Sequence, residues 1–61
     1  MTRSELMRLV SISMMLSVEV TLTDRKGQNH IGIVQSIERE DGSGYRFNVK
    51  IGNVVVYIHC Q

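Results

Sequence analysis

The side chains in this sequence that most readily do covalent chemistry are those of Cys60 and of the two histidines, His30 and His59. A catalytic cysteine needs an imidazole within hydrogen-bond reach that can take the thiol proton. His59 and Cys60 are neighbours in a run typical of a strand, so their side chains are expected to point to opposite faces. His30 lies far away along the chain. This pattern argues against nucleophilic catalysis.

The carboxylates are no better arranged for acid–base chemistry. Glu38, Glu40 and Asp41 lie in or beside a charged, glycine-rich loop over residues 39–44, where carboxylates are generally solvated. The histidines and the cysteine lack the spacing of a zinc finger, and no glycine-rich phosphate loop leads into a helix. We therefore expect no enzyme activity, no metal site and no cofactor.

The length of the chain bears on its assembly. Its 61 residues predict one domain, residues 1–61. A domain this small buries little apolar surface and generally needs a further source of stability. A single cysteine excludes an internal disulfide framework, so we expect a homo-oligomer.

Charge and hydropathy narrow the range of partners. The formal net charge of +1 argues against a protein that holds duplex DNA mainly through its phosphates. The apolar run from Leu9 to Leu16 is interrupted by Ser11 and Ser13 and is too short to cross a bilayer. One free cysteine and the lack of a secretory signal favour a cytoplasmic protein with no membrane partner.

Periodicity predicts one helix followed by four strands. Thr2 and Glu5 form a capping-box pattern, and apolar residues then recur at helical spacing, which predicts a helix over about residues 3–15. Period-two alternation predicts the strands, over about residues 17–23, 29–39, 44–51 and 54–60. We expect a mainly β protein in which an N-terminal helix precedes a strongly bent, four-stranded antiparallel sheet.

Three glycines are expected to shape this sheet. Gly27 lies in the polar turn between the first two strands, and Gly52 opens a two-residue turn that favours a type II′ hairpin. Gly32 lies inside an apolar run, which is typical of a bulge, a bend or a close approach by another backbone. A bend at Gly32 would let the sheet curl into a small SH3-like barrel.

The segment around this bend resembles a known signature. From Gly27 to Glu38 the chain has two glycines separated by four residues and then an apolar–x–x–apolar–acid run. This is similar to the first signature of Sm-like proteins, a family that includes bacterial Hfq. Near the end of the chain, Tyr57-Ile58-His59 resembles the Tyr-Lys-His of Hfq's second signature. The resemblance covers most of the chain and implies a small Sm-like barrel.

The resemblance also implies a function, the non-catalytic binding of U-rich or A-rich single-stranded RNA by an oligomer. An aromatic side chain would stack a base, while polar and basic groups would contact base edges, sugars and phosphates. The RNA-binding residues that it implies are Tyr57, His59, Tyr45, Gln35, Arg25, Lys26, Arg46 and Lys50. Tyr57 and His59 are also compatible with an outward polar pair on a sheet.

A second function on the same barrel stays open. Ile58 takes the place of the family's lysine, the net charge is low, and the chain ends at Gln61, where the family continues into a fifth strand. These departures favour a protein-interaction module, an inhibitor or adaptor of a larger nucleic-acid-handling machine, similar to Rho inhibitors of the Rof type. Its contact surfaces would be the methionine-rich helix and an exposed edge strand.

Overall fold

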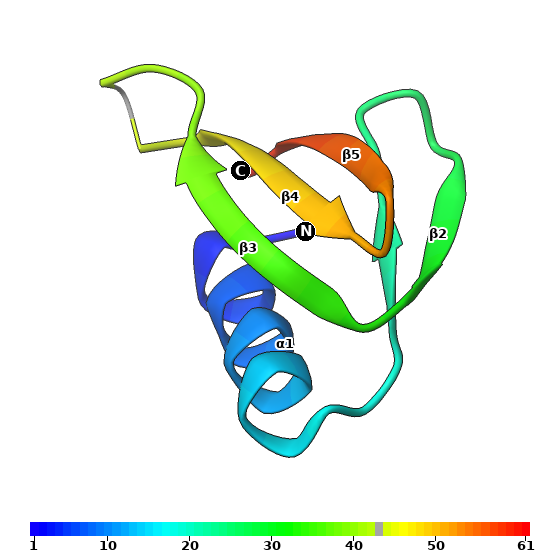
Figure 1. The fold of residues 1–61 in the computed structure, drawn as a ribbon. Coiled ribbons are helices and arrows are strands. Elements are labelled where there is room, and N and C mark those ends of the chain that lie inside the picture. Colours follow the sequence, from blue (N-terminus) through cyan, green and yellow to red (C-terminus); the bar gives the residue numbers. More distant parts are fainter. Residues whose placement is uncertain (43) are drawn as a thin grey trace.

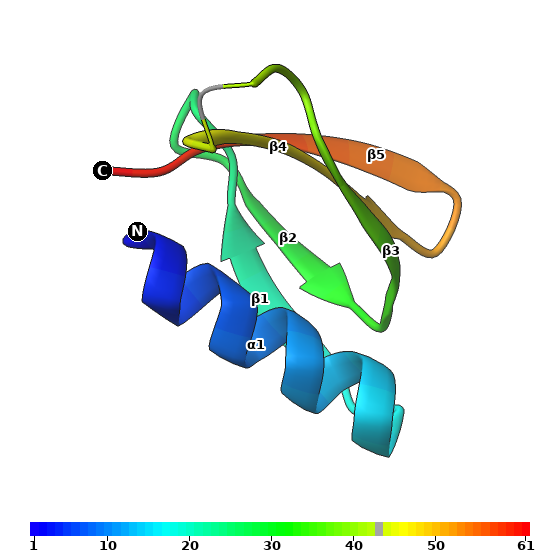
Figure 2. The same cartoon turned by 90° about the vertical axis from the view of Figure 1, so that its left-hand side faces the viewer.

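The computed structural model describes residues 1–42 and 44–61. In these residues helix α1 is followed by five strands: α1 (Arg3–Leu16), β1 (Val20–Thr23), β2 (Asn29–Gly32), β3 (Val34–Arg39), β4 (Arg46–Ile51) and β5 (Val54–His59). Strands β1 and β2 form an antiparallel hairpin, and β3, β4 and β5 form a second antiparallel sheet in that order. Figures 1 and 2 show α1 lying along one side of both sheets.

Helix α1 has defined ends and one buried face. The hydroxyl of Thr2 accepts a hydrogen bond from the Glu5 N–H and donates one to the Glu5 carboxylate, both at 3.1 Å. The helix stops at Ser17, whose backbone is left-handed with φ 54°, a common way to end a helix. The buried residues Leu6, Val10 and Ser13 follow helical spacing.

Ser13 joins α1 to the beginning of β3. Its side chain is fully buried, and its hydroxyl donates to the Val18 carbonyl at 2.7 Å. The same hydroxyl accepts a hydrogen bond from the Val34 N–H at 2.8 Å. A buried polar group is tolerated when it is hydrogen-bonded in this way, so Ser13 fixes the end of the helix against the sheet.

The β1–β2 hairpin shows the alternation expected from the sequence. Val20 and Leu22 are buried while Thr21 and Thr23 are exposed. The strand begins at Val20, later than the predicted residue 17, because the chain leaves α1 through the left-handed Ser17.

The turn of this hairpin is closed at both ends. The Asp24 N–H donates to the Gln28 carbonyl at 2.9 Å, and the Gly27 N–H donates to the Asp24 carbonyl at 3.0 Å. Gly27 has a φ of 84°, as in a three-residue hairpin loop that ends in a left-handed residue. This conformation accounts for glycine at the position.

Gly32 marks the end of β2 rather than a bend within one strand. A Cβ atom placed on Gly32 would clash with the Ile51 side chain, so only glycine allows β4 to pack this closely. Ile33 lies outside both strands, and a bulge between Val34 and Ser36 leaves Gln35 unpaired on β3. The bulge adds local twist, and the chain passes here from one sheet to the other.

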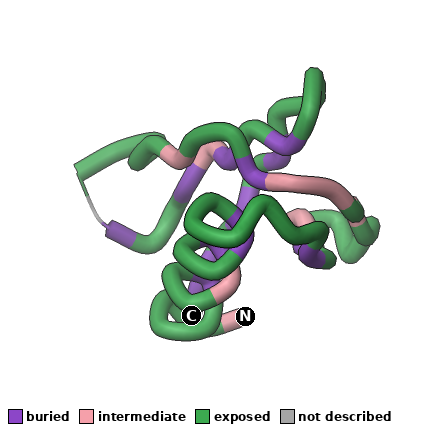
Figure 3. The backbone as a smooth tube through the Cα atoms, turned by 60° about the horizontal axis from the view of Figure 1, so that its bottom comes forward, coloured by how far each residue is buried: buried purple, intermediate pink, exposed green. Residues whose placement is uncertain are grey.

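The second sheet supplies most of the core. In β4 the buried Phe47, Val49 and Ile51 alternate with Arg46, Asn48 and Lys50. The two-residue turn into β5 begins at Gly52, whose φ is 57°. Figure 3 shows buried positions on the helix and on the strands, alternating with exposed ones along the chain. The buried apolar side chains are those of Leu6, Val10, Val20, Leu22, Val34, Phe47, Val49, Ile51, Val56, Ile58 and Cys60.

The mainly β architecture predicted from the sequence, with an N-terminal helix and antiparallel strands, is confirmed. The prediction of one four-stranded sheet is wrong, because the expected strand over residues 29–39 is divided at Ile33 into β2 and β3, which belong to different sheets. Residue 43 of the predicted glycine-rich loop lies outside the described residues. Within the described part of the chain, no helix has the length and apolar character needed to cross a membrane.

Candidate nucleic-acid interface

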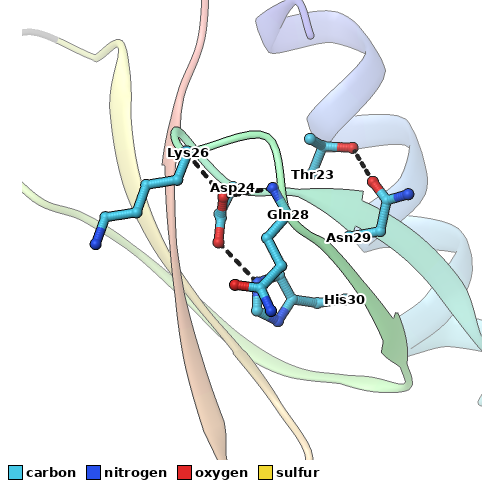
Figure 4. Close-up of polar contacts among 6 residues, drawn as sticks. All are labelled: Thr23, Asp24, Lys26, Gln28, Asn29 and His30. Atoms are coloured by element: carbon cyan, nitrogen blue, oxygen red, sulfur yellow. Dashed lines mark hydrogen bonds and ion pairs between the residues drawn. The ribbon is translucent and has the colours of Figure 1, made fainter.

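Asp24 organises the turn between β1 and β2. Its Oδ1 atom accepts hydrogen bonds from the N–H groups of Lys26 at 2.8 Å and Gln28 at 2.9 Å. Its Oδ2 atom lies 2.9 Å from Nε2 of His30. Figure 4 shows these contacts together with the hydrogen bond from Thr23 to Asn29 across the hairpin. An aspartate that bonds backbone groups two residues ahead is a common device for a tight turn.

The hydrogen bond from His30 is the main reason that the pKa of Asp24 is lowered from its ordinary value of 3.8. The N–H of Gln28 lowers this pKa further, because it also favours the charged carboxylate. Asp24 is therefore ionised at neutral pH and holds the His30 ring in place. The side chain of Lys26 points away from Asp24 (Figure 4).

Arg25 connects this turn to the edge of the second sheet. Its N–H donates to the Tyr57 carbonyl on β5 at 3.2 Å. Its guanidinium carbon lies over the Tyr57 ring, 5.5 Å from the centroid, which is within the range of a cation–π contact. Two predicted RNA-binding residues are thus brought together by both main chain and side chain.

A groove of about 280 Å³ lies between the turn and β5. It is lined by Asp24, Arg25, Lys26, Gln28, His30, Val55, Val56 and Tyr57. The groove combines an exposed aromatic ring with two cations and a histidine, which are the groups that stack bases and contact phosphates.

The outward-facing residues of β3, β4 and β5 continue this surface. Residues paired across neighbouring strands share a face, and the register pairs Arg46 with His59, and Lys50 with Val55. Tyr57 pairs with Asn48, which pairs in turn with Glu38 on β3. We call the row Glu38–Asn48–Tyr57 the central row. The outer sheet face is defined as this row together with Arg46, His59, Ser36, Lys50 and Val55.

Most of the predicted RNA-binding residues therefore lie on one continuous surface. Tyr57, His59, Arg46 and Lys50 are on the outer sheet face, and Arg25 and Lys26 border it from the β1–β2 turn. Among the described residues, none of the cations Arg25, Lys26, Arg46 and Lys50 lies within ion-pair distance of a carboxylate; the one contact of this kind joins the Asp24 carboxylate to His30. Their charges are available to a polyanion.

Two predicted residues lie elsewhere. Gln35 is the unpaired residue of the β3 bulge, and its side-chain amide approaches the Ile33 carbonyl at 3.5 Å. Tyr45 lies beside the first turn of α1, where the guanidinium carbon of Arg3 is 5.6 Å from its ring centroid. Neither contributes to the groove beside Tyr57.

Asn48, Asp24 and Gln28 are additions that the sequence did not suggest. Asn48 belongs to the site because the strand register pairs it with Tyr57. Asp24 and Gln28 belong to it because the β1–β2 turn places them in the lining of the groove. An aspartate opening a polar turn was the one available signal. Among the described residues, no group of three or more histidine, cysteine or carboxylate side chains gathers as a metal site.

Comparisons with protein-family models, with curated proteins and with solved structures find no match to this chain.

Proposed function

We propose that this chain binds single-stranded RNA, without catalysing a reaction on it, through the outer sheet face and the groove beside Tyr57. The observation that carries this proposal is the position of Tyr57, an exposed ring under the Arg25 guanidinium and on the same face as the β4 cations Arg46 and Lys50. Base stacking on an aromatic side chain contributes about 1–3 kcal/mol per base.

The cations around Tyr57 have separate roles in this proposal. Arg25 extends the stacking platform, since guanidinium planes also stack on bases. Lys26 and Arg46 contact phosphates, Lys50 contacts a phosphate or a base edge, and His59 contacts sugar or base from its place opposite Arg46. The resemblance to Sm-like proteins adds the expectation of U-rich or A-rich targets.

A small Sm-like barrel and a homo-oligomer are parts of the same proposal. The order of a helix, a hairpin and a three-stranded sheet supports the barrel, and the hydrogen bond from Arg25 to Tyr57 links its two halves. Exposed apolar side chains on β2 and β5, Ile31 and Val54, support contact between subunits. The unpaired thiol of Cys60 suits a reducing cytoplasm.

Two measurements on the full chain test this function. The first is anisotropy of labelled oligo-U and oligo-A titrated at two salt concentrations. We expect the logarithm of the association constant to fall linearly with the logarithm of the salt concentration. The slope should be roughly −2 to −3, as for contacts to three or four phosphates of a single strand. The second is mass by light scattering, which should exceed that of the monomer. Absence of binding to both oligonucleotides would refute the function.

A protein-interaction module is a second candidate, favoured by the far end of α1. Met15 is 81% exposed and Leu16 is 67% exposed, an unusual arrangement for large apolar side chains. In this candidate the end of the helix contacts a larger machine. The double substitution Met15→Glu and Leu16→Lys should then abolish partner binding while leaving RNA affinity unchanged.

A further inference from the structure

A cavity lies on the outer sheet face, between the central row and the adjacent row formed by Ser36, Lys50 and Val55. The cavity has a volume of about 240 Å³ and is lined by Ser36, Glu38, Asn48, Lys50 and Val55. Tyr57 lies directly across from Asn48 on β5. Adjacent strands are about 4.8 Å apart, so a base stacked on Tyr57 extends over Asn48 toward this cavity.

Asn48 carries an unsatisfied acceptor at this place. Its Oδ1 atom is buried and has no hydrogen-bond partner within the described part of the chain. Buried polar side-chain atoms are nearly always hydrogen-bonded, and an exception calls for an explanation. The terminal torsion of asparagine is broad, so a small rotation presents this oxygen to a donor in the cavity.

The charged groups of the cavity define what kind of ligand edge it fits. The Glu38 carboxylate is an acceptor only, and the Lys50 ammonium is a donor only. Together with the Asn48 oxygen they offer two acceptors from neighbouring strands and a cationic donor, on Lys50, from the adjacent row. The Ser36 hydroxyl can donate or accept. The complementary edge has two adjacent donors and one acceptor.

We propose that this cavity recognises guanine in the bound RNA, an inference that rests on the function proposed above. Guanine presents N1–H and the 2-amino group side by side as donors, with O6 next to them as an acceptor. Its donors bond to Glu38 and Asn48, and O6 accepts from Lys50, while the ring stacks on Tyr57. Uracil presents a single N3–H donor between two carbonyl oxygens, so it can bond to only one of the two acceptors and places a carbonyl oxygen next to the other. Adenine and cytosine lack the N1–H donor of guanine.

The test uses labelled RNA pentamers with uridine at four positions and guanine, inosine, adenine, cytosine or uridine at the centre. We expect the central guanine to bind about tenfold more tightly than adenine or uridine, the size of one good base-edge contact. Inosine lacks the 2-amino group and should fall between guanine and adenine. Equal affinity for all central bases would overturn the inference and leave the proposed function standing.

Two glutamate variants test whether the preference for guanine arises in this cavity. Glu38→Gln removes the acceptor-only carboxylate, so the ratio of guanine to adenine affinity should fall close to one. Glu40→Gln removes the same charge next to Arg46, outside the cavity, and should strengthen binding of every pentamer equally. A guanine preference that survives Glu38→Gln would refute the assignment. Failure of all pentamers to bind the wild-type chain would refute RNA binding itself. Circular dichroism melting checks that both variants fold.

Discussion

Arg25 and Tyr57 are joined by two different contacts, a hydrogen bond of 3.2 Å from the Arg25 N–H to the Tyr57 carbonyl and a guanidinium 5.5 Å from the ring centroid. The first contact joins the β1–β2 turn to the edge of β5. The second contact keeps the Tyr57 ring beside a cation at the surface. The same pair therefore contributes to both the fold and the candidate binding surface.

Gly32→Ala should destabilise the chain by about 1–3 kcal/mol, the usual cost of overpacking. The added methyl group has to occupy the space that the Ile51 side chain fills. Urea denaturation followed by circular dichroism measures the free energy of unfolding. Gly42→Ala is the matched control, because a Cβ there meets no atom within 4 Å. Equal stability of the two variants would contradict the close packing at Gly32.

Ser13→Ala should cost about 1–3 kcal/mol, because the Val34 N–H and the Val18 carbonyl lose their partner. Ser11, on the exposed side of α1, provides the control. Ser11→Ala should change the free energy of unfolding by less than about 0.5 kcal/mol. If both substitutions had the same small effect, Ser13 would not join α1 to β3.

The sequence predicted the secondary-structure elements and their buried faces better than it predicted how these elements contact one another. Alternation identified the buried Val20 and Leu22 because one face of a strand packs inward whatever it meets. Ser13 looked like a polar interruption, and its role became visible only when Val34 was placed beside it. The division at Ile33 was missed because an apolar run does not record where a chain changes sheets.

For the candidate site as well, residue types were predicted from the sequence better than tertiary contacts were. The basic turn was identified by residue type, and Tyr57 and His59 by their resemblance to the second signature of Hfq. Strand register places these two residues with Arg46 and Lys50 on one face. The separation of Tyr45 from Tyr57 depends on tertiary packing against Arg3, which sequence spacing does not contain. Asn48 was missed because its importance comes from an unpaired oxygen.

Stability should fall in acid as Asp24 is protonated. Because the pKa of Asp24 is lowered by His30 in the folded chain, the unfolded chain binds this proton more readily. The stabilisation is complete above the ordinary value of 3.8 and is lost as the pH falls through the lower folded pKa. His30→Gln should raise the pKa of the Asp24 carboxyl, measured by NMR titration. An unchanged pKa in this variant would contradict the role assigned to the His30 contact.

Cys60 should react slowly in the folded chain. Its side chain is 3% exposed, and burial raises the pKa of its thiol, so little thiolate is present at neutral pH. Alkylation by iodoacetamide should be at least roughly tenfold slower in buffer than in denaturant. Equal rates in the two conditions would show that Cys60 is not part of the core.

The two tyrosines form a matched pair for the central claim. Each is 46% exposed and lies under an arginine, at 5.5 Å for Tyr57 and 5.6 Å for Tyr45. They differ in place, since Tyr57 borders the outer sheet face and Tyr45 lies beside α1.

The most direct measurement is therefore the affinity of a short single-stranded RNA for the wild-type chain, Tyr57→Ala and Tyr45→Ala at one salt concentration. We expect Tyr57→Ala to weaken binding by about tenfold or more, the loss of one stacked base, and Tyr45→Ala to leave it within about twofold. Equal losses in the two variants, or a loss confined to Tyr45→Ala, would contradict an RNA-binding surface centred on Tyr57.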